Sequence, residues 1–246
     1  MVPVGEMTTS TRFALVFLGA LFLLLVFKQG CQPLLGAFDS EEGKLIGKIN
    51  DADDPEVRTR LIDELEEMPV EYINFANRWL AIHAVRSPGA WDDEGFDHRR
   101  TNTPRDIEIL TGVLYGVSDI ENGGLHQFFI NGTGGMAPEM VEFFKRYDLE
   151  EAAEKLKQAM AVFGEEYPRS QEARNRFLEQ FEGTTRQEFD PFHEMDGPFF
   201  EALLKGVQSM DDHADRVVRE VWGITSLHTE LPPVDWQPSL FSEKSR

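Results

Sequence analysis

The stretch ENGGLHQFFING, residues 121–132, is the part of this sequence that decides the fold. Two glycines after Asn122 permit positive φ and a close backbone approach, so a helix running to about Ile120 can turn sharply there. Leu125, Phe128 and Phe129 then recur at helical spacing. We expect a short helix to restart after the glycines and to end at residues 131–132, a second pair that tolerates the left-handed conformation.

The rest of the chain also has helical punctuation. Asp53 or Asp54 can cap a helix that begins at Pro55. Asp148 can cap another, with Glu151 placed as in a capping box. No segment alternates in polarity as a half-buried strand does. The sequence therefore predicts an all-α fold, a multi-helix globular bundle, with further helices over residues 69–83, 104–120, 136–147, 149–163, 170–181, 197–209 and 214–222.

The charge of the chain is strongly negative and unevenly distributed. Of its 246 residues, 44 are Asp or Glu and 24 are Lys or Arg. The first 38 residues hold one acid and two bases, so residues 39–246 carry 43 acids against 22 bases, a net charge of −21. A domain of that charge repels nucleic acid and anionic lipid and attracts basic partners. We therefore expect no direct binding of nucleic acid.

An apolar run, residues 13–27, precedes this acidic part. It favours a single N-terminal hydrophobic helix that anchors the chain in a membrane, over a cleaved signal or a lipoprotein site at Cys31. With one base on each flank, the sequence leaves open on which side of the membrane the acidic domain lies. The organisation we expect is a signal-anchor (1–30), a juxtamembrane linker (31–52), an acidic helical domain (53–228) and a proline-containing tail (229–246).

The glycine-containing stretch resembles the DNA mimic protein C-terminal domain family, an acidic, all-helical bacterial family formerly described as a domain of unknown function. The resemblance continues in the same order through residues 140–144, 151–163, 167–178 and 189–192, and covers about residues 104–204. It implies a helical interaction domain rather than an enzyme. The motif residues at the helix junction are Asn122, Gly123, Gly124, Gln127 and Asn131.

Catalytic and metal chemistry find little support in the sequence. His126 follows the glycine turn, but no nucleophile or second base stands at a supporting spacing. A single cysteine, Cys31, excludes an intrachain disulfide and a thiolate zinc site. Residues 92–98 fail the calcium-loop pattern, and residues 211–215 are explained by helix capping. We predict no catalytic residue, no cofactor and no metal, with a small-molecule enzyme using His126 as the third choice.

Acidic side chains on consecutive helices are the candidate contacts for a partner. A rigid scaffold that spaces carboxylates could occupy the DNA-binding face of a basic protein. The sequence therefore favours a membrane-tethered interaction domain that binds a basic protein, with an extracytoplasmic envelope domain whose acidity serves solubility as the alternative. A homodimer is compatible with so many aromatic residues. The candidate acids are Glu139, Glu142, Asp148, Glu150, Glu151, Glu154, Glu165 and Glu166.

Overall fold

The computed structural model describes residues 40–70, 73–83, 103–181, 183, 185–205, 209–233 and 235–236. All regular secondary structure within them is helical, which confirms the predicted fold class. The α-helices are α3 (Glu41–Asp51), α4 (Pro55–Glu67), α5 (Phe75–His83), α6 (Arg105–Ile130), α7 (Ala137–Arg146), α8 (Glu150–Met160), α9 (Gln171–Leu178), α10 (Arg186–Phe189), α11 (His193–Leu204) and α12 (Met210–Arg216). Three further turns are η2 (Gly132–Met136), η3 (Ala161–Phe163) and η4 (Val217–Val221).

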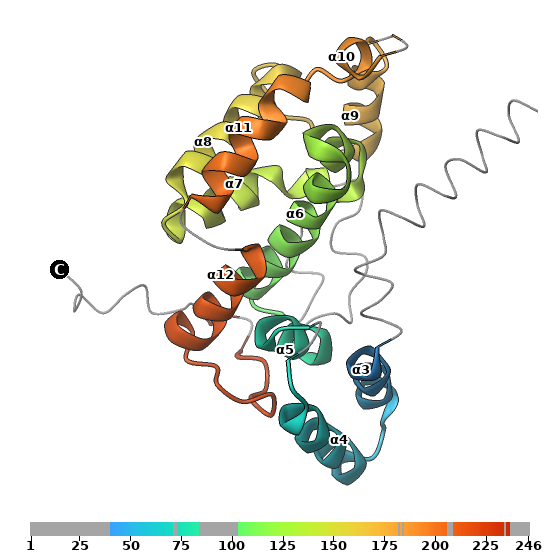
Figure 1. The fold of residues 1–246 in the computed structure, drawn as a ribbon, viewed down its shortest axis with the longest axis vertical. Helices are drawn as coiled ribbons and strands as arrows, with labels where there is room; N and C mark the ends of the chain where they lie inside the picture. The colour runs from blue at the N-terminus through green and yellow to red at the C-terminus, as the bar shows by residue number, and fades with distance from the viewer. Residues whose placement is uncertain are drawn as a thin grey trace, which may run out of the picture.

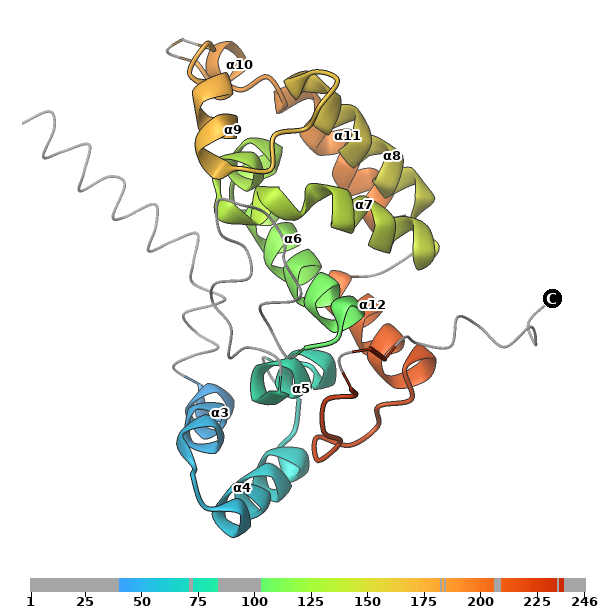
Figure 2. The same cartoon turned by 180° about the vertical axis from the view of Figure 1, so that it is seen from behind.

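The helices are arranged around α6, which runs along the middle of an elongated molecule (Figure 1). Helices α3, α4, α5 and α12 lie at one end of α6, and α7 to α11 lie at the other (Figures 1 and 2). Helix α8 packs against both α7 and α11. The aromatic side chains expected in the core lie there: Phe128, Phe129, Phe143, Phe144, Phe163 and Phe199 are buried, and Phe177, Phe181 and Phe200 pack against them.

Helix α3 lies within the segment expected to be a juxtamembrane linker, residues 31–52. Residues 41–51 are helical, because the side chain of Ser40 caps the first turn and Leu45, Ile46 and Ile49 bury one face. This apolar stripe stabilises a helix in spite of Gly43 and Gly47. The next helix begins as expected: Asp54 accepts from the backbone N–H groups of residues 56 and 57, at 2.8 and 3.3 Å, and Pro55 holds the first helical position.

Arginine side chains close the carboxyl ends of these N-terminal helices. Arg78 is 3% exposed, pairs with the equally buried Glu42, and donates to the carbonyls of Leu65, Met68 and Pro69 after α4. Arg58 donates to the last carbonyls of α3 and α5. The final carbonyls of a helix lack intrahelical donors and carry the negative end of its dipole, so a guanidinium satisfies both needs.

The chain after α11 returns to these N-terminal helices. The side chain of Asn77 donates to Asp211 on α12 at 2.8 Å, and Asp215 accepts from the backbone N–H of Ala76 at 2.6 Å. Further along, the indole of Trp79 donates to the carbonyl of Thr229 at 2.7 Å. Residues far apart in the sequence therefore build one packed unit, visible where α12 lies beside α5 in Figure 2.

The expected capping box before α8 is wrong. Asp148 has φ 63° and its side chain does not cap the helix, which instead begins at Glu150 after Leu149. Leu149 is 5% exposed, and its N–H donates to the carbonyl of Phe144 at 2.8 Å. Burial of this leucine fixes the turn, and Asp148 takes the left-handed conformation that aspartate tolerates.

Several expectations concern residues outside the described ranges. They include the apolar anchor (13–27), Cys31, the polar loop through residue 102 and the end of the tail (237–246). Among the described residues, no helix combines the length and the apolarity that crossing a bilayer requires.

Candidate protein-interaction site

The glycine turn breaks α6 into two helical segments as the sequence predicted. Gly123 has φ −154° and ψ 15°, and Gly124 has φ 79° and ψ −176°, so the backbone leaves helical geometry at both residues. The second segment begins at Leu125 and buries Leu125, Phe128 and Phe129. It ends at Asn131, which has φ −85° and is extended rather than left-handed, so that part of the prediction is wrong.

Two side chains from the α10–α11 region hold the break in α6. Asp196 accepts the N–H of Leu125 at 2.8 Å, which satisfies an amide at the start of the second segment. Arg186 donates to the carbonyl of Gly123 at 3.2 Å and to Asp196 at 2.7 Å. A side chain on Gly124 would lie 2.5 Å from Asp196 and 2.6 Å from Arg186. Gly124 is therefore required both by its φ and by the closeness of this pair.

The polar motif residues beyond the glycines face the interior of the domain. Asn131 donates to Asp119 at 2.9 Å, and Gln127 and Thr133 also bond to this carboxylate. Burial raises the pKa of Asp119, and these three hydrogen bonds offset part of that effect. Asn122 differs from the other polar motif residues because it is exposed. Gln127 and Asn131 thus organise the junction, and their partner was invisible to sequence reasoning because Asp119 carries no motif of its own.

The carboxyl end of α6 is closed by a buried arginine, Arg174 on α9. Its side chain is 0% exposed and donates to the carbonyls of Phe129 and Asn131, at 2.8 and 2.7 Å. It also donates to the carbonyls of Pro168 and Arg169. One guanidinium therefore joins the end of the motif helix to the loop before α9.

His126 lies on the outer side of this junction. Its ring meets Phe189 edge-on, with centroids 5.6 Å apart. Burial lowers the pKa of His126, so the imidazole is neutral near pH 7. The charged groups that act on it are Asp190, Arg186 and Asp196, which are already bonded to one another. This geometry gives His126 a packing role and offers no activated nucleophile.

Beside His126, the side chains of Asp190, His193 and Asp196 bring ligand-type atoms within 4.8 Å of one another. Sequence reasoning missed this group because its members belong to no recognised metal spacing. Arg186 donates to both carboxylates, at 3.0 and 2.7 Å. Their negative charge is thus already met by a resident cation, so the group serves the helix junction.

Two of the candidate contact acids are engaged inside the domain. Glu139 is 8% exposed and accepts from Arg169 at 2.6 Å. Glu142 receives two bonds from Arg105, at 3.0 and 2.8 Å, and one from Arg146 at 2.6 Å. The bonds from Arg105 are the main reason that the pKa of Glu142 is lowered. Both carboxylates are largely neutralised by their own chain.

The other candidate acids are exposed. Glu151 pairs with Lys205 at 2.6 Å and Glu154 with Lys145 at 3.2 Å, but exposed pairs such as these are weak and screened by salt. No ion pair among the described residues involves the remaining four, which are Asp148, Glu150, Glu165 and Glu166. Helix α11, packed beside α8, adds the exposed Glu194 and Glu201, which sequence reasoning missed because it could not pair these helices.

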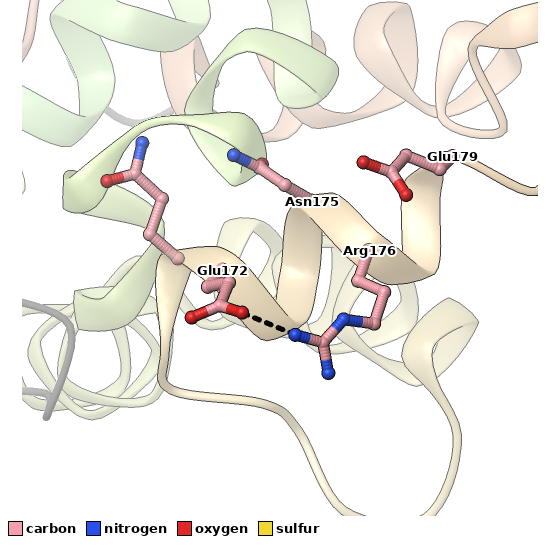
Figure 3. A pocket seen from close by; sticks show the side chains of 5 residues that line it. Glu172, Asn175, Arg176 and Glu179 are labelled. Carbon is pink, nitrogen blue, oxygen red and sulfur yellow. Dashed lines mark hydrogen bonds and ion pairs between the residues drawn. The ribbon is translucent and has the colours of Figure 1, made fainter.

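A polar pocket lies along α9 (Figure 3). Its lining side chains come from this helix and from Glu179 directly after it, and Glu172 pairs with Arg176 across one helical turn. Asn175 and Glu179 complete the labelled wall in Figure 3. A surface built from one helix, with its charges partly paired, does not enclose a small molecule.

Comparison with known proteins places this geometry in a family. No curated protein matches the chain, and no solved structure matches it. A family model described as DMP19-like protein matches residues 102–219, the part that runs from the start of α6 into η4. This match includes the whole glycine junction, the exposed acids of α8 and α11, and Arg174. Residues 102–219 are therefore similar to the DMP19-like family, in agreement with the resemblance seen in the sequence, and are called the DMP19-like domain below.

Proposed function

We propose that this chain is a non-enzymatic acidic protein that binds a basic, DNA-binding protein in place of DNA. The contact surface is formed by the exposed carboxylates of α8, α11 and the turn at residues 164–166. The observation that carries the proposal is the division of charge: several arginines are bound inside the fold, and the charged side chains exposed among the described residues are mainly carboxylates. The match of residues 102–219 to the DMP19-like family, which is not an enzyme family, supports the same class of function.

Several arginines are bound to carbonyls or carboxylates of the fold, and this leaves fewer unpaired cations at the surface. Arg78 and Arg174 are buried on backbone carbonyls, and Arg58 donates to two more. Arg105, Arg146 and Arg169 bind Asp106, Glu139 and Glu142. The outward field therefore comes mainly from carboxylates, and such a field attracts basic surfaces and speeds their encounter.

The scaffold also holds its carboxylates in place. Helix α8 buries Ala152, Ala153, Leu156 and Ala159, all 0% exposed, against α7 and α11. Glu150 and Glu154 therefore stand one turn apart on a fixed helix, about 5–6 Å between Cβ atoms. A basic protein that grips duplex DNA reads a similarly fixed array of negative charges. Rigid placement spares the partner the ordering cost that a disordered acidic tail would impose.

The membrane tether through residues 13–27 belongs to this proposal and rests on the sequence alone. Reporter fusions after Arg246, each active on only one side of the membrane, test it. A cytoplasmic signal leaves the domain access to DNA-binding proteins. An extracytoplasmic signal supports the alternative, an envelope-associated domain whose acidity serves solubility.

The contact surface is tested by neutralising acids without changing the fold. We expect the full chain, immobilised in detergent, to capture mainly basic proteins from a bacterial lysate, and to release them with duplex DNA or on raising salt from about 50 to 200 mM. Replacing four surface acids by glutamine should weaken capture roughly tenfold, because each removes a contact charge. The four replaced residues are Glu150, Glu165, Glu166 and Glu201.

A matched control separates a specific surface from net charge. It neutralises four exposed acids at the other end of the molecule, and so changes the net charge by the same amount. The control variant should retain capture within about twofold, because salt screens the electrostatic effect of a charge on distant parts of the surface. Equal losses in both variants, or captured proteins with no basic bias, would refute the proposed surface. The control residues are Asp51, Asp53, Glu64 and Glu67.

A further inference from the structure

His213 on α12 is a buried imidazole at the seam between α12 and the end of α7. The side chain is 1% exposed. Its ring lies edge-on to Phe143 and Tyr147, with centroids 6.1 and 6.5 Å apart and interplanar angles of 81° and 78°. Tyr147 in turn accepts a hydrogen bond from the indole of Trp222 at 3.1 Å. His213 therefore faces aromatic side chains and has almost no contact with solvent.

The hydrogen bonds of His213 fix its protonation state. Nδ1 lies 3.1 Å from the guanidinium of Arg216, which can only donate, so Nδ1 must be the acceptor. In the neutral imidazole the proton then sits on Nε2, and this atom is buried with no hydrogen-bond partner among the described residues. A second proton would have to go on Nδ1. It would break the bond from Arg216 and place two positive groups in contact.

Few negatively charged groups around His213 would stabilise a second proton on its ring. Arg216 opposes it from α12 itself, and Asp148, in the turn after α7, favours it but is exposed. On the packed elements, Arg146 of α7 is held by Asp106 of α6, and Asp215 of α12 faces the backbone of α5. The other charged groups near α12 are Glu121 on α6, Asp211 and Asp212 on α12, and Arg219 and Glu220 on η4.

We propose that His213 is an acid-sensitive release for α12, whose contact with the end of α7 loosens when the imidazole takes up a second proton. On α12, Asp211 and Asp215 also accept hydrogen bonds from Asn77 and Ala76 of α5, so release of α12 would uncouple the N-terminal helices from the DMP19-like domain's α7. This acid response does not depend on the proposed partner. It changes how α12 holds the N-terminal helices and α7 together.

The size of the effect follows from proton linkage. Burial, followed by the charge of Arg216, lowers the pKa of His213 from 6.5 to about 4 in the closed arrangement. With an ordinary pKa of 6.5 for His213 in the open arrangement, the closed arrangement becomes less stable relative to the open one as pH falls below 6.5. This destabilisation stops increasing near pH 4, where the closed arrangement also takes up the proton. Between pH 7 and pH 5 the ratio of open to closed α12 should rise roughly 20-fold.

Hydrogen exchange of the full chain in detergent, corrected for the pH dependence of the intrinsic exchange rate, tests this release. We expect amides of residues 210–222 to lose protection roughly 20-fold from pH 7 to pH 5, while those of residues 105–120 in α6 change much less. In His213→Phe, which keeps an aromatic ring against Phe143, this difference should disappear. His228→Gln, at a half-buried histidine away from this seam, serves as the control and should behave as the wild type.

Two further variants of exposed residues keep the test independent of the folding of His213→Phe. Arg216→Gln removes the opposing charge and should weaken the acid response. Asp148→Asn removes the favourable charge and should leave the response between pH 7 and pH 5 nearly unchanged, because the pKa of His213 in the closed arrangement is already about 4. An equal loss of protection in α6 and α12, or an unchanged acid response in His213→Phe or in Arg216→Gln, would overturn the proposal.

Discussion

Arg174→Met is expected to leave the DMP19-like domain largely unfolded at 25 °C. The methionine keeps much of the volume but removes the guanidinium donors from the carbonyls of Phe129, Pro168 and Arg169, and leaves the carbonyl of Asn131 with the N–H of Gly134. These carbonyls surround a side chain with no solvent access, and each unsatisfied buried group costs about 1–3 kcal/mol. A loss of more than about 4 kcal/mol is comparable to the whole stability of many domains.

Urea unfolding followed by far-ultraviolet circular dichroism measures this loss. Arg174→Lys keeps the charge but cannot reach four carbonyls in one plane, so its cost should lie between those of the wild type and the methionine variant. Arg176→Met is the matched control on the same helix, because its side chain is 72% exposed and its pair with Glu172 is at the surface. It should change stability by less than about 0.5 kcal/mol. A stable Arg174→Met protein would show that water or another donor replaces the guanidinium.

The helix junction was predictable because its cause is local. Gly123 and Gly124 indicate a backbone conformation that other residues adopt only at a cost. Leu125, Phe128 and Phe129 indicate the buried face of the helix that follows. Aromatic side chains at helical spacing also predicted the core correctly, since burial of apolar area dominates folding. The cap at Asp54 was predictable for the same reason, because it acts within three residues.

Contacts between distant residues were not predictable from this sequence. Arg174 bonds to carbonyls more than 40 residues earlier, and nothing in its neighbourhood distinguishes it from the exposed Arg176. Glu139 and Glu142 likewise read as surface acids, yet tertiary packing brings Arg169 and Arg105 to them. The net charge of a protein follows from its sequence, but which acids and bases pair and cancel one another depends on the fold.

Helix boundaries failed where burial competed with capping. Asp148 and Glu151 form a good local cap, but burying Leu149 moves the start of α8 and turns Asp148 outward. Helix α11 begins at His193, earlier than Gly197, and accommodates Pro198 within its first two turns. In both places the packing of neighbouring residues, rather than the backbone preference of a single residue, determines where the helix begins.

Gly124→Ala is the second substitution with a large expected effect, a loss of about 3–5 kcal/mol. At φ 79° and ψ −176° the backbone lies in a region open essentially only to glycine, which costs another residue about 1–3 kcal/mol. The new methyl group would also meet Asp196 and Arg186 at 2.5 and 2.6 Å. Moving them would release the N–H of Leu125, a further loss of about 1–2 kcal/mol.

Two other glycines separate these contributions in the same urea titration. Gly164 has φ 107° but no atom within 4 Å of an added methyl group, so Gly164→Ala should show the backbone cost alone, about 1–2 kcal/mol. Gly197, next to Asp196 in α11, has ordinary φ and no atom beyond its chain neighbours within 4 Å, but it precedes Pro198, so the helix propensity gained by Gly197→Ala is offset by contact with the proline ring and stability should change by less than about 1 kcal/mol. If Gly124→Ala costs no more than Gly164→Ala, the close approach of Asp196 and Arg186 contributes nothing. A larger cost at Gly124 means that α10 and α11 hold the kink, and that the glycine motif and the acidic helices depend on each other.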